Sequence, residues 1–129
     1  MSSMEAAGLW VGLNILLLIF LSARVGQART MFKINIGDGD HPEMTKAIRT
    51  QGNYIEYAPA AIGGLITLAL LGAHPVVIHG LGAVFFLGRI AHLLGLGMNK
   101  WGQGRMVGTI LTMVTLLVTA LALFYFSFT

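Results

Sequence analysis

The sequence predicts an all-α integral membrane four-helix bundle, formed by a single domain of residues 1–129. Hydrophobic residues make up 56% of the chain and charged residues only 10%, whereas soluble domains carry about 25% charged residues. The apolar residues gather in four stretches, and about 20 residues are needed to cross a bilayer. Each stretch is long enough, the second only with its polar first turns included. The formal charge of +3 does not indicate nucleic-acid binding, because the positions of the basic residues are explained by membrane topology.

The first helix is predicted over residues 5–25. Residues 6–23 carry no charge and a single amide, Asn14. No basic residue precedes this stretch, and the sequence before Arg24 is a weak cleavage site. We therefore interpret it as a retained transmembrane helix rather than a cleaved signal peptide.

The second helix is predicted over residues 42–72, after a turn-rich connection. The stretch IGDGD at residues 36–40 could suggest a calcium loop, but the other ligand positions are missing, so a turn is favoured. Asp40 and Glu43 resemble a capping box, with Pro42 in the first turn. A helix of this length spans about 45 Å, so its first turns are expected to project beyond the hydrocarbon.

Polar side chains share one face of this second helix. At 100° per residue, Arg49, Asn53 and Glu56 fall within roughly 60° of one another. Ionisable groups at membrane depth are costly, so they indicate a functional site. Pro59 cannot donate a hydrogen bond to the carbonyl of Ile55, which predicts a kink beside this face.

The third helix is predicted over residues 76–97, after the break at Pro75. Arg89 and His92 are spaced to face the same direction, and Arg89 cannot be neutralised. We expect Arg89 to pair with Glu56 or with another buried acceptor. His92 has two interpretations, a core histidine bonded to a backbone carbonyl or a site residue. The four histidines lack metal-ligand spacing and cysteine is absent, so no metal site is predicted.

The fourth helix is predicted over residues 105–128, which carry no charge after Arg105. Arg105 could be an interfacial anchor whose side chain reaches lipid headgroups, or a ligand contact. The pairs Gly8/Gly12 and Gly104/Gly108 have the four-residue spacing that predicts close helix packing.

The positive charges predict the orientation. All eight Lys and Arg residues lie in, or toward, the connections between the first and second and between the third and fourth helices. The termini and the remaining turn carry none. By the positive-inside rule, both basic connections are cytoplasmic and both termini are non-cytoplasmic.

One combination of these residues resembles a known family. The order is Arg-x-Gln-x-Asn-x-x-Glu-Tyr-x-Pro at residues 49–59, then Arg89 and His92, then Arg105 at the start of the last helix. It resembles the MAPEG family, the membrane-associated proteins in eicosanoid and glutathione metabolism. The similarity covers nearly the whole chain, including Arg24 at the end of the first helix and Pro42 before the second.

The resemblance implies a homotrimer that binds glutathione between adjacent subunits near the cytoplasmic interface. It implies contacts to glutathione from two subunits: Arg49, Asn53, Glu56 and Tyr57 from one, and Arg24 and Gln51 from its neighbour. Gln51 lies about 200° around the helix from Arg49, which fits a role toward another subunit. We therefore expect Arg24 and Gln51 to lack partners within their own chain. Arg89 and His92 would line the site, and Arg105 would face the sulfur.

Two features depart from the family pattern. Eicosanoid-producing members carry a tyrosine where Leu96 stands, and the connection from Arg24 to Pro42 is longer than in the leukotriene synthase. Despite these departures, the resemblance implies a glutathione transferase or peroxidase acting on lipophilic small molecules in a bacterial inner membrane. A non-catalytic lipid-binding or scaffold protein is the main alternative. A small multidrug transporter is a third, but such transporters place their carboxylate in the first helix, and here the buried acid is expected to be Glu56.

Overall fold

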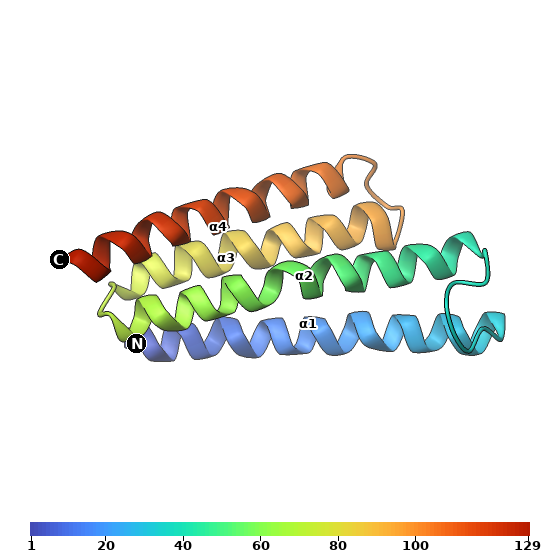
Figure 1. The fold of residues 1–129 in the computed structure, drawn as a ribbon, viewed down its shortest axis with the longest axis horizontal. Coiled ribbons are helices and arrows are strands. Elements are labelled where there is room, and N and C mark those ends of the chain that lie inside the picture. The colour runs from blue at the N-terminus through green and yellow to red at the C-terminus, as the bar shows by residue number, and fades with distance from the viewer.

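The computed structural model describes all residues 1–129, which form four long α-helices and a short π-helix without any strand. In chain order the elements are α1 Ser3–Phe32, α2 Pro42–Leu70, α3 Pro75–His92, the π-helix η1 Leu93–Gly97, and α4 Gly104–Phe128. The helices run side by side as a bundle in which α1 packs mainly on α2 and α3 mainly on α4 (Figure 1). The predicted all-α four-helix fold is confirmed.

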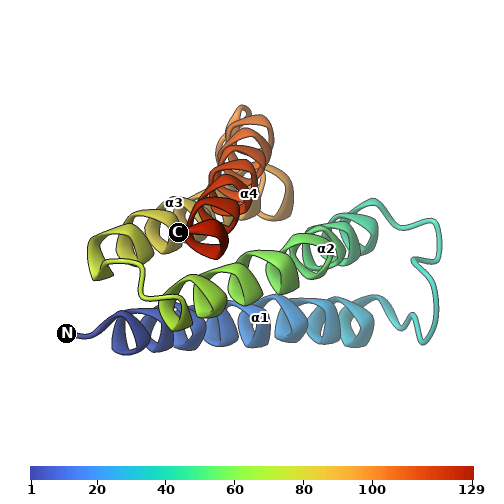
Figure 2. The same cartoon turned by 60° about the vertical axis from the view of Figure 1, so that its left-hand side comes forward.

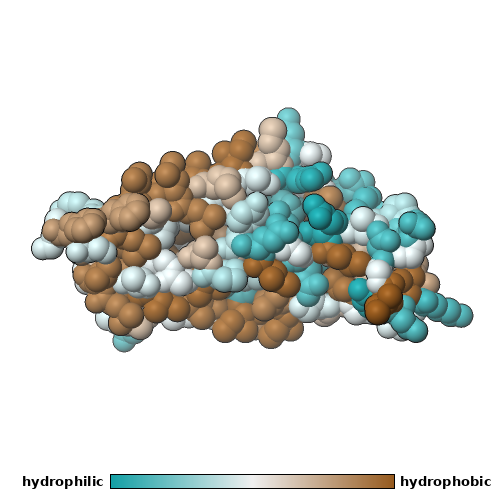
Figure 3. Space-filling model, viewed as in Figure 1, coloured by the Kyte–Doolittle hydropathy of each residue, from teal (hydrophilic) through white to brown (hydrophobic).

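Polar residues gather at one end of the bundle. The connection from α1 to α2 and the connection from η1 to α4 lie at the same end, whereas both termini and the α2–α3 turn lie at the other (Figures 1 and 2). The surface is largely hydrophilic toward the first end and largely hydrophobic toward the second (Figure 3). The basic connections therefore share one end of the molecule.

Three helical segments are long and apolar enough to cross a membrane, namely α1, α3 with η1, and α4. The packing of α4 agrees with a membrane-spanning helix, because its buried residues are small or weakly polar and its large apolar residues face outward. The buried set is Gly104, Gly108, Thr112, Thr115 and Thr119. Outward apolar side chains with a small-residue interface are typical of a helix that faces lipid. Helix α2 is long enough to span, but its first half is polar.

Helix α1 is longer than the sequence analysis predicted. It continues to Phe32 rather than ending near residue 25, and Lys33 closes it in the left-handed conformation with φ 56°. Residues 25–32 contain no helix-breaking proline, so the helix persists after its apolar stretch ends. Its last turns therefore pack beside the first turns of α2. Arg29 stabilises the following loop, since its Nη1 donates to the carbonyl of Gly37 at 3.0 Å.

The predicted capping box at the start of α2 is wrong. The N-cap is His41 rather than Asp40, and it makes no side-chain capping bond. A residue before proline is driven toward extended backbone, and His41 adopts it with φ −96° and ψ 116°. Asp38 orders the loop instead, because its carboxylate accepts from the Asp40 amide at 3.1 Å and the Thr45 hydroxyl at 2.7 Å. The predicted turn and the proline in the first helical turn are confirmed.

The third helix was predicted over residues 76–97, and the structure has one continuous helical segment over Pro75–Gly97 whose last turn differs in type. Helix α3 ends at His92 and the chain widens into η1. Gly95 lies so close to Gly104 and to the Arg105 backbone nitrogen that a side chain at Gly95 would clash with the start of α4. The wide turn thus accompanies a close approach of α4 that no local pattern reveals.

Glycine spacing predicted one of the two close helix contacts. Gly108 lies against the backbones of Gly88 and His92, where a Cβ atom would clash, so α3 and α4 touch there as predicted. Gly8 and Gly12 face open space, with no atom of the chain near the position of a Cβ. Their spacing therefore makes no helix contact within the chain.

Candidate functional site

Arg89 is the centre of a polar cluster inside the bundle. Its side chain leaves α3, is 3% exposed, and contacts two neighbouring helices. Nη1 donates to Asn53 Oδ1 of α2 at 2.7 Å, and Nη2 donates to the Gly108 carbonyl of α4 at 3.1 Å. The predicted partner was Glu56 or another buried acceptor, and the structure selects the second option. Glu56 is exposed and makes no bond to Arg89.

Aromatic rings enclose the same guanidinium. The Arg89 Cζ lies 5.8 Å from the centre of the Tyr57 ring and 6.0 Å from that of Phe85. Both distances are within the range of cation–π attraction. The cluster therefore brings together three of the predicted site residues, namely Asn53, Tyr57 and Arg89.

His92 lies one turn beyond Arg89 on α3 and is also 3% exposed. A core histidine of the kind considered from the sequence would bond a backbone carbonyl, but no hydrogen bond satisfies the His92 ring. Its backbone instead packs directly against Gly108 of α4. His92 is therefore buried one helical turn from Arg89, and its ring nitrogens make no hydrogen bond within the chain.

The other predicted charges face outward without partners. Arg49, Glu56 and Arg105 are exposed, and the one ion pair in the chain joins Lys46 to Glu43 at 2.9 Å. Arg105 lies on the first turn of α4, in an open recess of about 440 Å³. That recess is also lined by Gly102, Met106, Thr109 and Ile110. These three side chains are free to contact a ligand, a lipid headgroup or another chain.

Arg24 and Gln51 differ from expectation, because each has a partner within its own chain. Arg24 Nη2 donates to the Gly97 carbonyl at 2.6 Å, so α1 holds the end of η1. Gln51 Nε2 donates to Ser22 Oγ at 2.8 Å. The expectation that both would lack partners is wrong, because the packing of α1 beside α2 and η1 brings Ser22 within reach of Gln51 and Arg24 within reach of the Gly97 carbonyl.

The Gln51–Ser22 bond also shows where the polar face of α2 lies along the apolar stretch of α1. It places Gln51 level with the end of the charge-free stretch of α1. Glu56 lies five residues further along α2, which is about 7.5 Å deeper into the bundle. The exposed carboxylate of Glu56 is therefore level with apolar residues of α1.

A second polar contact, which the sequence analysis did not identify, joins α1 to α2. Tyr54 Oη donates to Asn14, with distances of 2.9 Å to its carbonyl oxygen and 3.2 Å to Oδ1. Both residues are buried, at 3% and 0% exposure. The signal was Asn14 itself, since a lone amide in an apolar span requires a partner.

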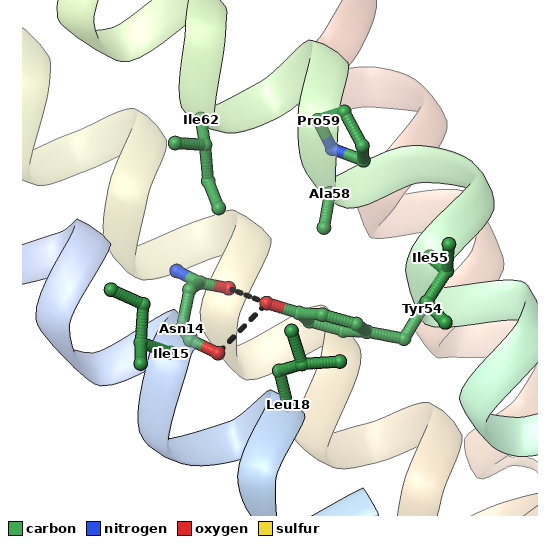
Figure 4. A pocket seen from close by; sticks show the side chains of 8 residues that line it. All are labelled: Asn14, Ile15, Leu18, Tyr54, Ile55, Ala58, Pro59 and Ile62. Carbon is green, nitrogen blue, oxygen red and sulfur yellow. Dashed lines mark hydrogen bonds between the residues drawn. The ribbon is translucent and has the colours of Figure 1, made fainter. Parts of the chain in front are cut away.

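This bond lies in a groove between α1 and α2 with a volume of about 200 Å³ (Figure 4). In Figure 4 the Tyr54 ring reaches across to Asn14, with apolar side chains above and below the pair. The apolar lining consists of Ile15, Leu18, Ile55, Ala58, Pro59 and Ile62. Because the two polar groups bond each other, the groove offers an apolar surface to whatever enters it.

Leu96 occupies the position at which the family resemblance calls for a tyrosine. It lies within η1 and is half-buried. Its side chain has no hydrogen-bonding group, so η1 contributes no side-chain donor at this position.

Comparison with known proteins identifies the relatives of this chain. The chain is 32% identical, over 105 residues that cover 80% of each protein, to "Inner membrane protein YecN" of Escherichia coli strain K12. The protein of the same name from Escherichia coli O6:H1 strain CFT073 matches equally. No solved structure matches significantly. The sequence profile of the MAPEG family matches residues 7–125, and together with the four-helix architecture this shows that the chain belongs to the MAPEG family.

Proposed function

We propose that this chain is a glutathione-binding protein of the bacterial inner membrane that conjugates or reduces lipophilic electrophiles, as a glutathione transferase or peroxidase. Family membership supports the membrane setting and the thiol chemistry. The printed name of the Escherichia coli relative supports the inner membrane. The lipophilic substrate would arrive from the bilayer, and glutathione from the cytoplasm.

One observation carries the proposal: exposed charges of both signs, without partners, lie within about one helical turn of residues that form the Arg89 cluster, Arg49 and Glu56 on either side of Asn53 and Arg105 before Gly108. Glutathione carries two carboxylates, one ammonium group and a thiol. Arg49 has the charge to bind a carboxylate, and Glu56 has the charge to bind the ammonium group. Arg105 has the charge to favour the thiolate. The charges of the site therefore fit those of glutathione.

The depth of Glu56 supports a site closed by a second copy of the chain. An exposed carboxylate level with apolar helix residues is unfavourable against lipid. A neighbouring subunit, or water held at a subunit interface, removes that cost. We infer a homotrimer with sites at its interfaces. Mass measurement in detergent tests this, and a monomer that binds glutathione with full affinity would contradict it.

The distribution of charge supports cytoplasmic basic loops and non-cytoplasmic termini. The chain has no native cysteine, so single cysteines report their own side of the membrane. Thr129→Cys should react with an impermeant maleimide in intact spheroplasts, and Gly37→Cys only after permeabilisation. The opposite pattern would reverse the proposed orientation.

Glutathione titration of the purified protein tests the proposed function, followed by a conjugation assay with chlorodinitrobenzene. Saturable binding and turnover are expected. Arg49→Ala should lose binding because it removes a cation available to a carboxylate. Lys33→Ala is the matched control, since it removes a cation from the loop at the same end. Absence of both binding and turnover in the unmodified protein would refute the proposal.

A second candidate is a non-catalytic lipid-binding or scaffold protein. Two observations favour it: Leu96 supplies no donor, and the groove beside Tyr54 presents an apolar lining. Under this alternative a fatty acid or phospholipid binds the purified protein, and glutathione, even if bound, is not turned over. The same conjugation assay separates the two candidates.

A further inference from the structure

Arg89 is a buried cation without a carboxylate partner. It is 3% exposed, and no acidic side chain lies within 4 Å of it, because the single ion pair in the chain is Lys46–Glu43. Its acceptors, the amide oxygen of Asn53 and the carbonyl of Gly108, are both neutral. Its Nε is buried without any hydrogen bond. Burial of a charge without a counter-ion is strongly unfavourable, so the cluster lacks a negative charge.

The bond to Arg89 also determines how Asn53 is oriented. A guanidinium has only donors, so Asn53 must turn Oδ1 toward it, as the 2.7 Å contact shows. A flipped amide would place its NH₂ group against the donors of Arg89. The Asn53 Nδ2 group is therefore directed away from Arg89, and it has no partner within the chain. Asn53 is half-buried, so this group is available to a ligand.

We propose that Arg89 is a positioning residue that makes the site selective for a carboxylate at Asn53. It holds Asn53 so that only N–H donors face the ligand, and it supplies positive charge that the bound carboxylate compensates. An ammonium group or a neutral ester is disfavoured at the same place. The identity of the ligand as glutathione rests on the proposed function, whereas the missing counter-charge rests on the chain alone.

The substitution Asn53→Asp tests the missing counter-charge and the selectivity for a carboxylate by two separate measurements. It places a carboxylate where the Asn53 amide oxygen contacts Arg89, so the chain supplies its own counter-ion and loses the outward donor. The matched control is Asn35→Asp, which makes the same chemical change in the exposed loop after α1. Melting temperature in detergent reports the counter-ion. Binding of glutathione and of its diethyl ester reports selectivity.

We expect Asn53→Asp to melt at a higher temperature than Asn35→Asp. Its affinity for glutathione should fall by about tenfold or more, as usual when a charge-assisted hydrogen bond is lost. Its affinity for the diethyl ester should change by less than about threefold, because the ester places no carboxylate at Asn53. The preference of the unmodified protein for the free acid should therefore collapse.

Arg89→Lys and Arg89→Gln provide the second measurement. Lysine keeps the charge and should retain part of the preference, whereas glutamine should abolish it. A purely structural role for Arg89 would weaken both ligands by the same factor, and that result would overturn the selectivity. A lower melting temperature for Asn53→Asp than for its control would overturn the missing counter-charge.

The comparison of melting temperatures requires no ligand, so it tests the missing counter-charge even if the protein binds no glutathione. In that event the proposed function would fail, and selectivity for a carboxylate of glutathione would fail with it. Failure of the selectivity alone would leave measurable glutathione binding without preference for the free acid.

Discussion

Replacement of Arg105 by alanine tests whether this residue stabilises a bound thiolate or anchors the helix to lipid headgroups. Arg105 is exposed on the first turn of α4, with no partner in the chain. At about 4 Å and an effective dielectric constant of about 20, a unit charge contributes about 4 kcal/mol to an anion. Exposure to solvent reduces this value. We take about 2.7 kcal/mol, which equals about two units of thiol pKa.

The consequence for thiol ionisation is large, and the consequence for rate is small. A thiol with a pKa of about 8.5 is about 3% ionised at pH 7, and a shift to about 6.5 makes it about 76% ionised. The thiolate fraction therefore rises about 25-fold. Thiolate nucleophilicity falls with pKa at a slope of about 0.4–0.5, so the net gain in rate is only about threefold. Any larger loss of turnover in Arg105→Ala measures the positioning of the sulfur.

The thiolate absorbance near 240 nm provides the assay, measured with bound glutathione. We expect Arg105→Ala to lose most of this signal and at least threefold in turnover, with glutathione affinity within about tenfold because Arg49 and Glu56 still bind the peptide. Lys100→Ala is the matched control, because it removes a positive charge from the turn that precedes α4. Full thiolate signal and turnover in Arg105→Ala would identify Arg105 as a headgroup anchor.

Three further predictions concern the packing and the loop. Tyr54→Phe removes the hydroxyl that donates to Asn14 and should cost about 1 kcal/mol or more in thermal unfolding, since it leaves the buried Oδ1 of Asn14 without a donor. Gly108→Ala should destabilise the chain and weaken glutathione binding together, because a Cβ there would clash with α3 and displace the carbonyl that Arg89 uses. Hydrogen bonds from the Thr45 hydroxyl and a backbone amide hold the pKa of Asp38 below its ordinary 3.8. Because the pKa of Asp38 is lower in the folded chain than in the unfolded chain, its ionised carboxylate stabilises the fold above about pH 3.8, and this stability is lost as the pH falls through the folded pKa. Thermal unfolding measured against pH should show this loss in acid, and Thr45→Val should make the loss smaller.

Much of the fold could be predicted from local sequence signals. Proline marks the starts of α2 and α3 and glycine the start of α4, and charge-free stretches mark α1 and α4. The end of α1 could not be predicted in this way. The apolar stretch reports where hydrocarbon ends, whereas the helix ends at Lys33, where the chain takes a left-handed residue. Hydrophobicity and helicity end at different places because they have different causes.

The site was only partly predictable, for a similar reason. The face that carries Asn53 and the buried position of Arg89 follow from helical periodicity and the cost of a charge in an apolar span. The choice of acceptor does not follow, because two helices must first be placed beside each other. Arg89 reaches Asn53 and a backbone carbonyl, while Glu56, which has the complementary charge, faces outward.

The geometry of the cluster depends on glycines that carry no chemistry of their own. Gly95 and Gly104 let η1 and α4 approach closely, and Gly108 then contacts α3 where its carbonyl meets Arg89. That carbonyl occupies one nitrogen of the guanidinium and leaves another for Asn53. Side chains at these glycines would separate the helices, move the carbonyl and release the amide of Asn53. The small-residue contact between α3 and α4 therefore determines which hydrogen-bonding groups the site presents to a ligand.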